Sequence, residues 1–391
     1  MPQPVVSFVL ATRNRCATTL ETLGKLHESA GSPGSFEIFV VDNASTDNTA
    51  EAVRREFPQV QVLRLEANYG AVAKNQALAY ASGRYVVFLD DDSYPLPGSI
   101  ERMCRHFQEN PKLGAASFTV RLPSGRRECS AYPGVFIGCG VGLRRCALDQ
   151  VGALPEDFFM QAEEYDLSLR LLDAGWEVRS FDDLHVFHAK SPATRSGAQK
   201  LRYDVRNNLL VVLRRFPSAW REPYLHEWMA RYWAMAAAGG RRLAAIRGFL
   251  SGAMRHLTTQ VHQPVSEATF ERFARVEETH RRVLEARSRC HLRRVVLVDW
   301  GKNILAYRLA CESAGIEIAA VADPSLAGCR YRNIPVVDDQ TAAGARVDAA
   351  IVANLSPVHA AERTVFWRKL TSVPVIDLFE EERSAVQFAA A

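Results

Sequence analysis

The sequence GRYVVFLDDDSYP, residues 83–95, places an apolar run directly before three consecutive carboxylates, Asp90, Asp91 and Asp92. The run Tyr85–Leu89 has the composition of a buried strand. Adjacent carboxylates repel one another, and a divalent cation with a preference for oxygen ligands is the simplest reason to collect them at a strand end. In an extended segment Asp90 and Asp92 project to the same side and can share one ion. The alternative is a turn, which Asp and Ser also favour.

Strand-like and helical patterns alternate before this run. Strands are predicted at Val5–Ala11, Glu37–Val41 and Val60–Leu65, and helices at Thr18–His27, Asn48–Phe57 and Val72–Ala81. This alternation predicts βαβ units and a mostly parallel sheet, in which ligands bind beyond the carboxyl ends of the strands. The polar clusters Thr12-Arg13-Asn14 and Asp42-Asn43-Ala44-Ser45 stand at two more strand ends. An α/β domain with a ligand site at this edge is therefore expected.

A second group of acids and two histidines follow further along the chain. Glu163-Glu164-Tyr165-Asp166 leads into a predicted helix at Leu167–Ala174. Acids at a helix start either complement the helix dipole or, in an active site, remove a proton from an attacking hydroxyl. His185 and His188 follow a predicted strand at Glu177–Phe181 and are expected in a loop. They are candidate ligands, although a histidine is more often structural.

These segments together resemble glycosyltransferase family 2, which has the GT-A nucleotide-sugar-binding fold, over Val5–Pro217. The matching segments are, in order, VVSFVLATRNR (5–15), FEIFVVDNASTDNT (36–49), NYGAVAKNQALAYASGRYVVFLDDDSYP (68–95), GCGVGLRRCALDQVGALPEDFF (138–159), FFMQAEEYDLSLRLLDAGW (158–176), HVFHAKSP (185–192) and RYDVRNNLLVVLRRFP (202–217). The match covers about half of the chain and is similar to members that transfer rhamnose or build polysaccharides.

The resemblance implies a role for each acidic segment. Asp90 and Asp92 match the motif that binds Mg²⁺ or Mn²⁺, with Asp91 beside them, and His188 matches a histidine that completes the metal or diphosphate site in some members. Glu164 matches the catalytic base, a position where Asp is usual. Because Glu is one methylene longer, the neighbouring acids Glu163 and Asp166 are alternative bases.

The resemblance also implies a donor site for a UDP- or dTDP-sugar. Thr12, Arg13 and Asp42 match the pocket for the nucleotide base, while Asn68, Gly70, Lys74 and Asn75 match the segment that lines the nucleotide-sugar, next to Asp90 and Asp91. Lys74 stands where Arg is frequent, and lysine meets a diphosphate as a point charge. The implied reaction is an inverting, metal-dependent transfer of the sugar to a hydroxyl acceptor, which could be a glycan, a lipid-linked sugar or a small molecule.

Beyond this segment we predict two more regions. The predicted division is a GT-A domain at 1–217, a helical middle segment at 218–290 and a small Rossmann-like α/β domain at 291–391. Strands of the last region are predicted at Val295–Asp299, Ile316–Ala322, Val336–Val337, Ala349–Ala353 and Val375–Ile376, with a helix at Ile304–Ala314. Its first turn, Asp299-Trp300-Gly301-Lys302, lacks most glycines of a dinucleotide site, which favours a structural or docking role.

Charge and composition limit the partners of the chain. Residues 191–294 hold 20 Lys and Arg against 8 Asp and Glu, whereas the whole chain carries only +4. This excess suggests an anionic partner, and since no nucleic-acid motif occurs, no nucleic acid is expected. The basic segment is either a helical extension packed on the catalytic domain or a peripheral membrane contact. No apolar run reaches 18 residues, no signal peptide is recognisable, and the cysteines are scattered. We therefore expect a cytoplasmic enzyme, either free in the cytoplasm or peripheral at the inner face of the membrane.

Two other functions compete with this interpretation. A sugar-1-phosphate nucleotidyltransferase would need a glycine-rich phosphate loop after the first strand, where this chain has Thr12-Arg13-Asn14-Arg15. A non-catalytic scaffold on a lapsed transferase domain is compatible with Glu164 in place of Asp, but not readily with the intact run of three aspartates.

Overall fold

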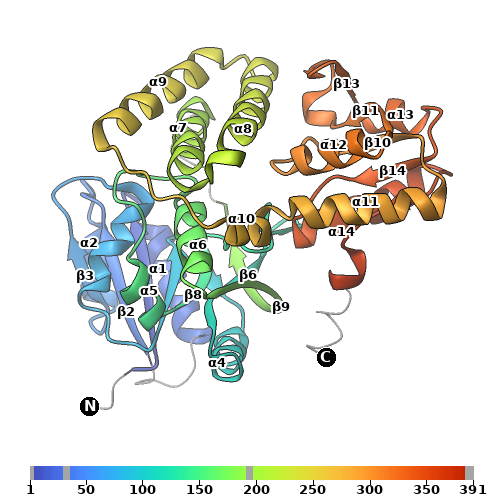
Figure 1. Cartoon of the computed structure of the whole chain (residues 1–391). Coiled ribbons are helices and arrows are strands. Elements are labelled where there is room, and N and C mark those ends of the chain that lie inside the picture. The colour runs from blue at the N-terminus through green and yellow to red at the C-terminus, as the bar shows by residue number, and fades with distance from the viewer. Residues whose placement is uncertain (1–3, 30–35, 191–196, 384–391) are drawn as a thin grey trace. The chain divides into compact units, whose positions relative to one another are not determined.

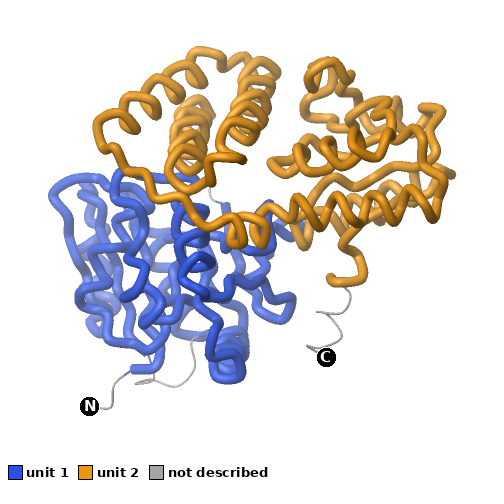
Figure 2. Tube along the Cα trace, viewed as in Figure 1, with its two compact units in different colours: residues 1–194 blue, residues 195–391 orange. Residues whose placement is uncertain are grey.

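The computed structural model describes residues 4–29, 36–190 and 197–383, so residues 191–196 of the basic segment lie outside it. The chain divides into two compact units, residues 1–194 and residues 195–391 (Figure 2). Each unit contains both helices and a β-sheet (Figure 1). The predicted division into three parts, with boundaries at 217 and 290, stays a prediction.

The first unit holds a mixed sheet in the strand order β3-β2-β1-β4-β8-β6-β9-β5, with β7 paired to β6. Its elements are β1 (Val6–Thr12), α1 (Cys16–Ser29), β2 (Phe36–Asp42), α2 (Thr49–Glu56), β3 (Gln61–Arg64), η1 (Gly70–Lys74), α3 (Asn75–Leu78), β4 (Tyr85–Asp90), β5 (Ser93–Pro95), α4 (Ser99–Glu109), β6 (Leu113–Arg121), β7 (Arg127–Glu128), β8 (Gly140–Arg144), α5 (Arg145–Val151), α6 (Glu163–Asp173) and β9 (Glu177–His188). The predicted strands all form, and β1 pairs in parallel with both β2 and β4.

The core of this unit explains why the apolar runs become strands. Phe8 and Leu10 of β1 point to the same face as Val87 and Leu89 of β4, and all four are buried in one cluster with residues of α1, α2 and α4. Because β1 is buried on both faces, its sequence reads as a nearly continuous apolar run. The carboxyl ends of β1, β2 and β4 therefore meet at one edge, as the alternation predicted.

Two sequence predictions in this unit need correction. His185 and His188 lie in strand β9 instead of a loop, because β9 pairs with β6 beyond a register shift that accommodates residues 182–184, and then with β5. The helix predicted at Val72–Ala81 is a 3₁₀ turn, η1, followed by the short helix α3. Contacts of two side chains in this stretch, described below, hold it in place, and tertiary contacts commonly override weak helix propensity.

The second unit combines helices with a smaller sheet. Its elements are α7 (Gly197–Arg215), α8 (Ser218–Ala238), α9 (Arg242–Thr259), α10 (Glu267–Ala274), α11 (Val276–Cys290), β10 (Arg294–Val298), α12 (Ile304–Ser313), β11 (Glu317–Ala322), η2 (Pro324–Leu326), β12 (Arg330–Tyr331), β13 (Ile334–Val337), α13 (Asp339–Ala343), β14 (Ala349–Val352), α14 (Pro357–Leu370) and β15 (Val375–Ile376). Helices α7, α8 and α9 pack together (Figure 1). The sheet has the order β12-β13-β11-β10-β14-β15, parallel except for β12.

No helix among the described residues is both long and apolar enough to cross a membrane.

Candidate active site

The three aspartates occupy the end of β4 and the turn after it. Asp90 is the last residue of the strand, and its side chain is 41% exposed, whereas Asp91 and Asp92 are buried. The buried Ser93 side chain holds this turn in place, because its hydroxyl accepts a hydrogen bond from the Asp90 amide and donates one to the Cys139 carbonyl. The run is therefore held rigidly, with one carboxylate facing outward and two facing the protein.

The two buried aspartates share a cation. Arg15 lies 3.2 Å from Asp91 and 3.0 Å from Asp92, and the Thr12 hydroxyl donates to Asp91 at 2.9 Å. Burial raises the pKa of Asp91 to about 6 despite these contacts. Burial also opposes ionisation of Asp92, but hydrogen bonds from His188 and Arg15 outweigh it and hold the pKa of Asp92 well below its usual range.

His188 of β9 completes a three-ligand cluster with Asp90 and Asp92. One ligand atom from each of the three residues can be chosen so that all lie within 4.8 Å of one another, and His188 Nε2 is 3.1 Å from Asp92 Oδ1. Burial alone would lower the pKa of His188, but the hydrogen bond with Asp92 raises it to about 10. The two carboxylates are ligands that Mn²⁺ and Mg²⁺ prefer, and His188 can add an imidazole nitrogen when the metal displaces its proton, so the residues fit a divalent cation.

Lys74 joins this cluster from η1. Its ammonium donates to Asp90 Oδ1 at 2.9 Å and to the Gly138 carbonyl at 3.0 Å, while the side chain is almost fully buried. Burial raises the pKa of Asp90, but the Lys74 charge more than compensates and the net shift is downward. The buried lysine therefore places a fixed positive charge beside the most exposed aspartate of the run.

The acids of α6 have three different environments. Glu163 is buried, its Oε2 has no hydrogen-bond partner, and burial together with the nearby Glu164 raises its pKa to about 8. Glu164 is half-buried. Asp166 is fully buried and receives a hydrogen bond from Arg170 at 2.8 Å. Asp166 is thus engaged within the helix, whereas Glu163 and Glu164 are at its first turn.

The backbone leading into α6 is strained. Phe159, Gln161 and Ala162 have φ values of 62°, 69° and 65°, in the left-handed region that residues with side chains rarely adopt. Gly70 holds this segment from the other side, because a Cβ there would lie 2.2 Å from the Phe159 carbonyl oxygen. The next amide, that of Ala71, donates to the same oxygen at 2.7 Å. Only glycine permits this approach, which links the predicted donor loop to the acidic helix.

The end of β2 presents a buried acid, Asp42. Its Oδ1 accepts a hydrogen bond from the Ser45 amide, and its Oδ2 has no hydrogen-bond partner but forms an ion pair with Arg64, whose Nε is 3.7 Å away. Next to it, the Asn43 amide donates to the Gly70 carbonyl and accepts from the Tyr69 amide. An unsatisfied buried carboxylate oxygen at a strand end is an acceptor for a ligand N–H.

The remaining predicted residues are near the site but differ in their contacts. The Asn75 side chain exchanges two hydrogen bonds with the backbone of Leu154, and Asn68 accepts from the Gly70 amide. Thr12 is buried against Asp91, and Arg13 is exposed. Thr12, Asn68 and Asn75 therefore hold Asp91 and the neighbouring backbone in place.

Sequence reasoning missed two residues that organise this site, Arg15 and Asn43. Both lie in segments quoted above, yet neither had been assigned a role. Arg15 neutralises the buried half of the aspartate run, and Asn43 fixes the loop at Gly70. A cation three residues after a strand, opposite an excess of acids, was the available signal for Arg15.

The second unit also places an acid after a central parallel strand, Asp299 after β10. The turn that follows is covered by the helices of the same unit: Trp228 donates to the Lys302 carbonyl at 2.8 Å and Arg231 to the Trp300 carbonyl at 2.7 Å. Trp300 is itself buried. This turn is therefore used for packing within the unit, in contrast to the turn after β4.

Comparison with known proteins gives a family match for the first unit. Residues 7–137 match the model of "Glycosyl transferase family 2". An N-acetylglucosaminyl-diphospho-decaprenol L-rhamnosyltransferase of Mycobacterium tuberculosis is 26% identical over 237 residues, which cover 48% of this chain and 77% of that protein. A UDP-Glc:α-D-GlcNAc-diphosphoundecaprenol β-1,3-glucosyltransferase of Escherichia coli is 26% identical over 215 residues, 51% of this chain and 83% of that protein.

Among solved structures, a mannosyltransferase from Pyrobaculum calidifontis in complex with GDP-Man and Mn²⁺ is 24% identical, with a TM-score of 0.46, over 65% of this chain and 81% of that chain.

Proposed function

Since residues 7–137 form a glycosyltransferase family 2 domain and the chain is a glycosyltransferase, we propose that it transfers a sugar from a UDP- or dTDP-sugar to a hydroxyl group, with inversion and with a divalent cation. The observation that carries this proposal is the cluster of Asp90, Asp92 and His188, in which the ligand atoms lie within 4.8 Å of one another beside Lys74. Mg²⁺ and Mn²⁺ are both suitable for these ligands.

The donor's nucleotide would lie along the ends of β1 and β2. Uracil and thymine both carry a ring N–H, and Oδ2 of Asp42, which has no hydrogen-bond partner, is an acceptor for it. Lys74 would meet the diphosphate as a buried point charge, and Arg13 is the exposed cation on the base side. Asp90 and Asp92, with His188, would hold the metal, which when bound would neutralise charge on the departing diphosphate.

We assign the general base to Glu164. As an acceptor hydroxyl oxygen bonds to the anomeric carbon, its proton passes to the Glu164 carboxylate, and the bond from that carbon to the diphosphate oxygen breaks, releasing the nucleoside diphosphate. Glu164 is half-buried and can be reached by an acceptor, whereas Glu163 is enclosed and Asp166 is engaged by Arg170. Holding donor and acceptor in line contributes much of the remaining acceleration.

The acceptor in this proposal is a sugar linked through diphosphate to a lipid. The names of the two relatives from M. tuberculosis and E. coli both specify a saccharide-diphospho-polyprenol acceptor. A transferase with such an acceptor would work at a membrane surface, as the peripheral alternative predicted from the sequence requires.

One experiment separates this function from a scaffold. Purified protein is incubated with UDP-, dTDP- and GDP-sugars, with Mn²⁺, Mg²⁺ or EDTA, while thermal stability and nucleotide release are monitored. We expect stabilisation and slow release with a UDP- or dTDP-sugar only when metal is present. The absence of any response to every donor would support the scaffold, and a response undiminished by EDTA would refute the metal site.

A further inference from the structure

Helix α9 has its small residues inside and its large apolar residues outside. Gly248 and Gly252 face α7, where a Cβ on Gly248 would lie 2.5 Å from the Arg202 carbonyl oxygen and one on Gly252 would lie 2.8 Å from Leu209. Ala245 is buried on the same face. Helix α7 therefore packs closely against the small residues of α9. The bulky apolar side chains of α9 take no part in this packing.

The outer face of α9 is an apolar stripe about the length of the helix. Its members recur every three or four residues, as one face of a helix requires, and they are Leu243, Ile246, Phe249, Leu250, Met254 and Leu257. Leu243, Leu250 and Leu257 are 70%, 61% and 70% exposed. Single exposed apolar residues are ordinary, but a continuous stripe of this kind marks an interaction surface.

The charged residues around this stripe indicate which kind of surface it binds. Residues 228–266 contain no Asp or Glu, and Arg242, Arg247 and Arg255 are exposed on α9 itself. Two copies of this face would bring arginines against arginines without a compensating acid. An anionic surface with an apolar interior, the surface of a bilayer that contains acidic phospholipid, satisfies both the stripe and the arginines.

We propose that α9 is a membrane-binding helix that lies in the plane of an anionic bilayer, with the apolar stripe inserted and the arginines at the level of the phosphates. This membrane contact involves the second unit alone and does not depend on the transferase activity proposed for the first. Within the basic segment 191–294, it is one face of α9 that would contact the membrane.

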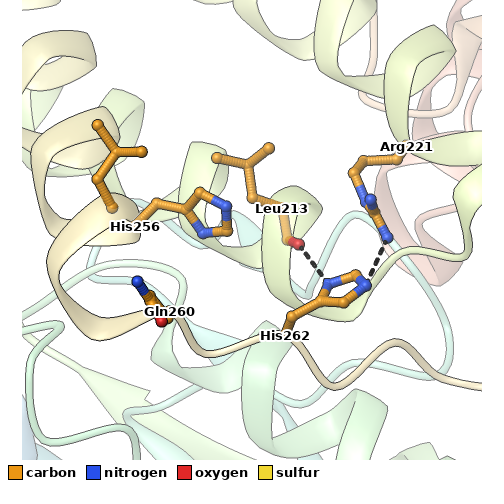
Figure 3. Close-up of a pocket in the computed structure, with 6 residues that line it drawn as sticks. Leu213, Arg221, His256, Gln260 and His262 are labelled. Carbon is orange, nitrogen blue, oxygen red and sulfur yellow. Dashed lines mark hydrogen bonds between the residues drawn. The ribbon is translucent and has the colours of Figure 1, made fainter.

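A basic cavity at the C-terminal end of the stripe supports this orientation. The cavity, of about 300 Å³, is lined by Leu257 of the stripe together with Arg221, His256, His262, Leu213 and Gln260 (Figure 3). Arg221 donates to His262 at 3.2 Å, and its buried Nε and the buried Nδ1 of His256 have no hydrogen-bond partner. The guanidinium of Arg221 gives this cavity a positive charge suited to the phosphate of a lipid whose chains would lie against Leu257.

The test is binding of the full chain to vesicles, measured by flotation without nucleotide. We compare phosphatidylcholine vesicles with mixed phosphatidylcholine–phosphatidylglycerol vesicles, using wild type, Leu250→Glu and Arg247→Ala. The matched control is Val365→Glu, which places the same charge on an exposed apolar residue, 54% exposed, of α14. Circular dichroism and melting temperature establish that each variant is folded, and because the substituted side chains are exposed, all should be.

The wild type should bind the mixed vesicles and bind phosphatidylcholine much more weakly. Leu250→Glu should lower the partition coefficient at least about tenfold, since it removes a leucine that would insert into the bilayer and adds repulsion between its carboxylate and the anionic lipid. Arg247→Ala should lower it about fivefold on the mixed vesicles, the effect of one basic residue near an anionic surface. Val365→Glu should bind as wild type does.

Three results would overturn the proposal. Equal binding of wild type and Leu250→Glu would show that the stripe does not insert. Equal binding to the two kinds of vesicle would remove the role of the arginines. Sedimentation of the wild type as a dimer that Leu250→Glu dissociates, without vesicle binding, would assign the stripe to a second copy of the chain. Arg221→Gln tests the cavity separately and should reduce the preference for anionic vesicles.

Discussion

Two acidic groups follow central parallel strands, the Asp90–Asp92 run with its neighbour Glu163 in the first unit and Asp299 in the second, and they differ in how completely the protein supplies their partners. Asp299 accepts from Arg363 at 2.8 Å and from Asn354 at 3.1 Å, and His359 lies 3.3 Å away. Arg363 also holds both oxygens of Asp339. In that group, every carboxylate oxygen has a partner supplied by the protein.

The aspartate run after β4 is not balanced in this way. The cations Arg15, Lys74 and His188 lie beside Asp90, Asp91 and Asp92, and the neighbouring Glu163, whose raised pKa keeps it protonated near neutral pH, has an Oε2 with no hydrogen-bond partner. The first strand end thus keeps a carboxyl oxygen without a partner, whereas the group around Asp299 has none. An acid at a strand end therefore indicates a ligand only when the protein leaves some of the hydrogen-bonding capacity around it without a partner.

Substitution of Asp92 and of Asp299 should have the largest and most different effects. Asp92→Asn should reduce transferase activity by about three orders of magnitude or more and abolish metal-dependent nucleotide binding, because a cation ligand is lost. Asp299→Asn should leave nucleotide binding and turnover unchanged and lower the free energy of unfolding by about 3 kcal/mol, as expected when a buried ion pair is broken.

Nucleotide titrations by calorimetry and urea unfolding of both variants provide the measurements. Normal metal-dependent binding by Asp92→Asn would contradict the proposed metal site. A loss of binding in Asp299→Asn would contradict the contrast between the two strand ends.

The acids of α6 sharpen the assignment of the base. Glu164→Gln should lower kcat by about 10²–10⁴-fold while the affinity for the donor stays the same, because only proton removal is lost. Glu163→Gln should retain more activity, since a buried group with a raised pKa already carries a proton near neutral pH. Full activity in Glu164→Gln together with loss in Glu163→Gln would move the base one residue back.

Two glycines with almost the same backbone form a matched pair across the units. Gly70 and Gly315 have φ values of +66° and +64°, but only at Gly70 would a Cβ meet another atom within 4 Å. Gly315→Ala should cost about 1 kcal/mol of stability for the left-handed conformation alone. Gly70→Ala should cost about 2 kcal/mol more because it overlaps the Phe159 carbonyl.

Because Phe159 leads into α6, Gly70→Ala should also lower kcat severalfold, whereas Gly315→Ala should not. Thermal melts and steady-state kinetics of both variants test this. Equal effects of the two substitutions on kcat would show that the contact between Gly70 and Phe159 does not position the acidic helix.

The smallest expected effect is a pH dependence in the second unit. The hydrogen bond with Asp299 raises the pKa of His359 above its ordinary value of about 6.5. The resulting stabilisation is fully present below about pH 6.5 and is lost as the pH rises through the raised value. Since the His359 side chain is 51% exposed, the change should not exceed about 0.5 kcal/mol.

Urea unfolding followed by tryptophan fluorescence is suited to this measurement, because five of the six tryptophans are in residues 195–391. His359→Gln should remove the slope between pH 6 and 9. A slope of the same size in His359→Gln would assign it to another group.

The sequence predicted β1 to β4, the start of β9, and β10, β11, β13, β14 and β15, because most of them are apolar runs between polar turns. It did not predict β5, β6, β7, β8 and β12. It also predicted the grouping of Asp90, Asp92 and His188, since all three belong to recognisable segments. It misplaced the end of β9, because Asp182 and Asp183 look like a turn, whereas a register shift carries the strand past them. Such irregularities depend on pairing between distant strands, which local patterns do not contain.

The roles of individual polar residues were harder to foresee. Nothing in the local sequence distinguishes Asp42, which retains an oxygen without a hydrogen bond, from Asp166, which is engaged by Arg170. Likewise, the excess of bulky residues on α9 is visible in the sequence, but which face lies outward depends on the glycines that meet α7. Both distinctions depend on neighbours supplied by other elements.

The three left-handed residues before α6 have a consequence for directed evolution of this enzyme. Each costs about 1–3 kcal/mol relative to a relaxed backbone, so a library selected for heat resistance alone should enrich glycine at positions 159, 161 and 162. Variants selected in this way would tolerate heating, but the start of α6 with its acids would no longer be held in one position. A screen for a durable catalyst should therefore select for product formation in every round.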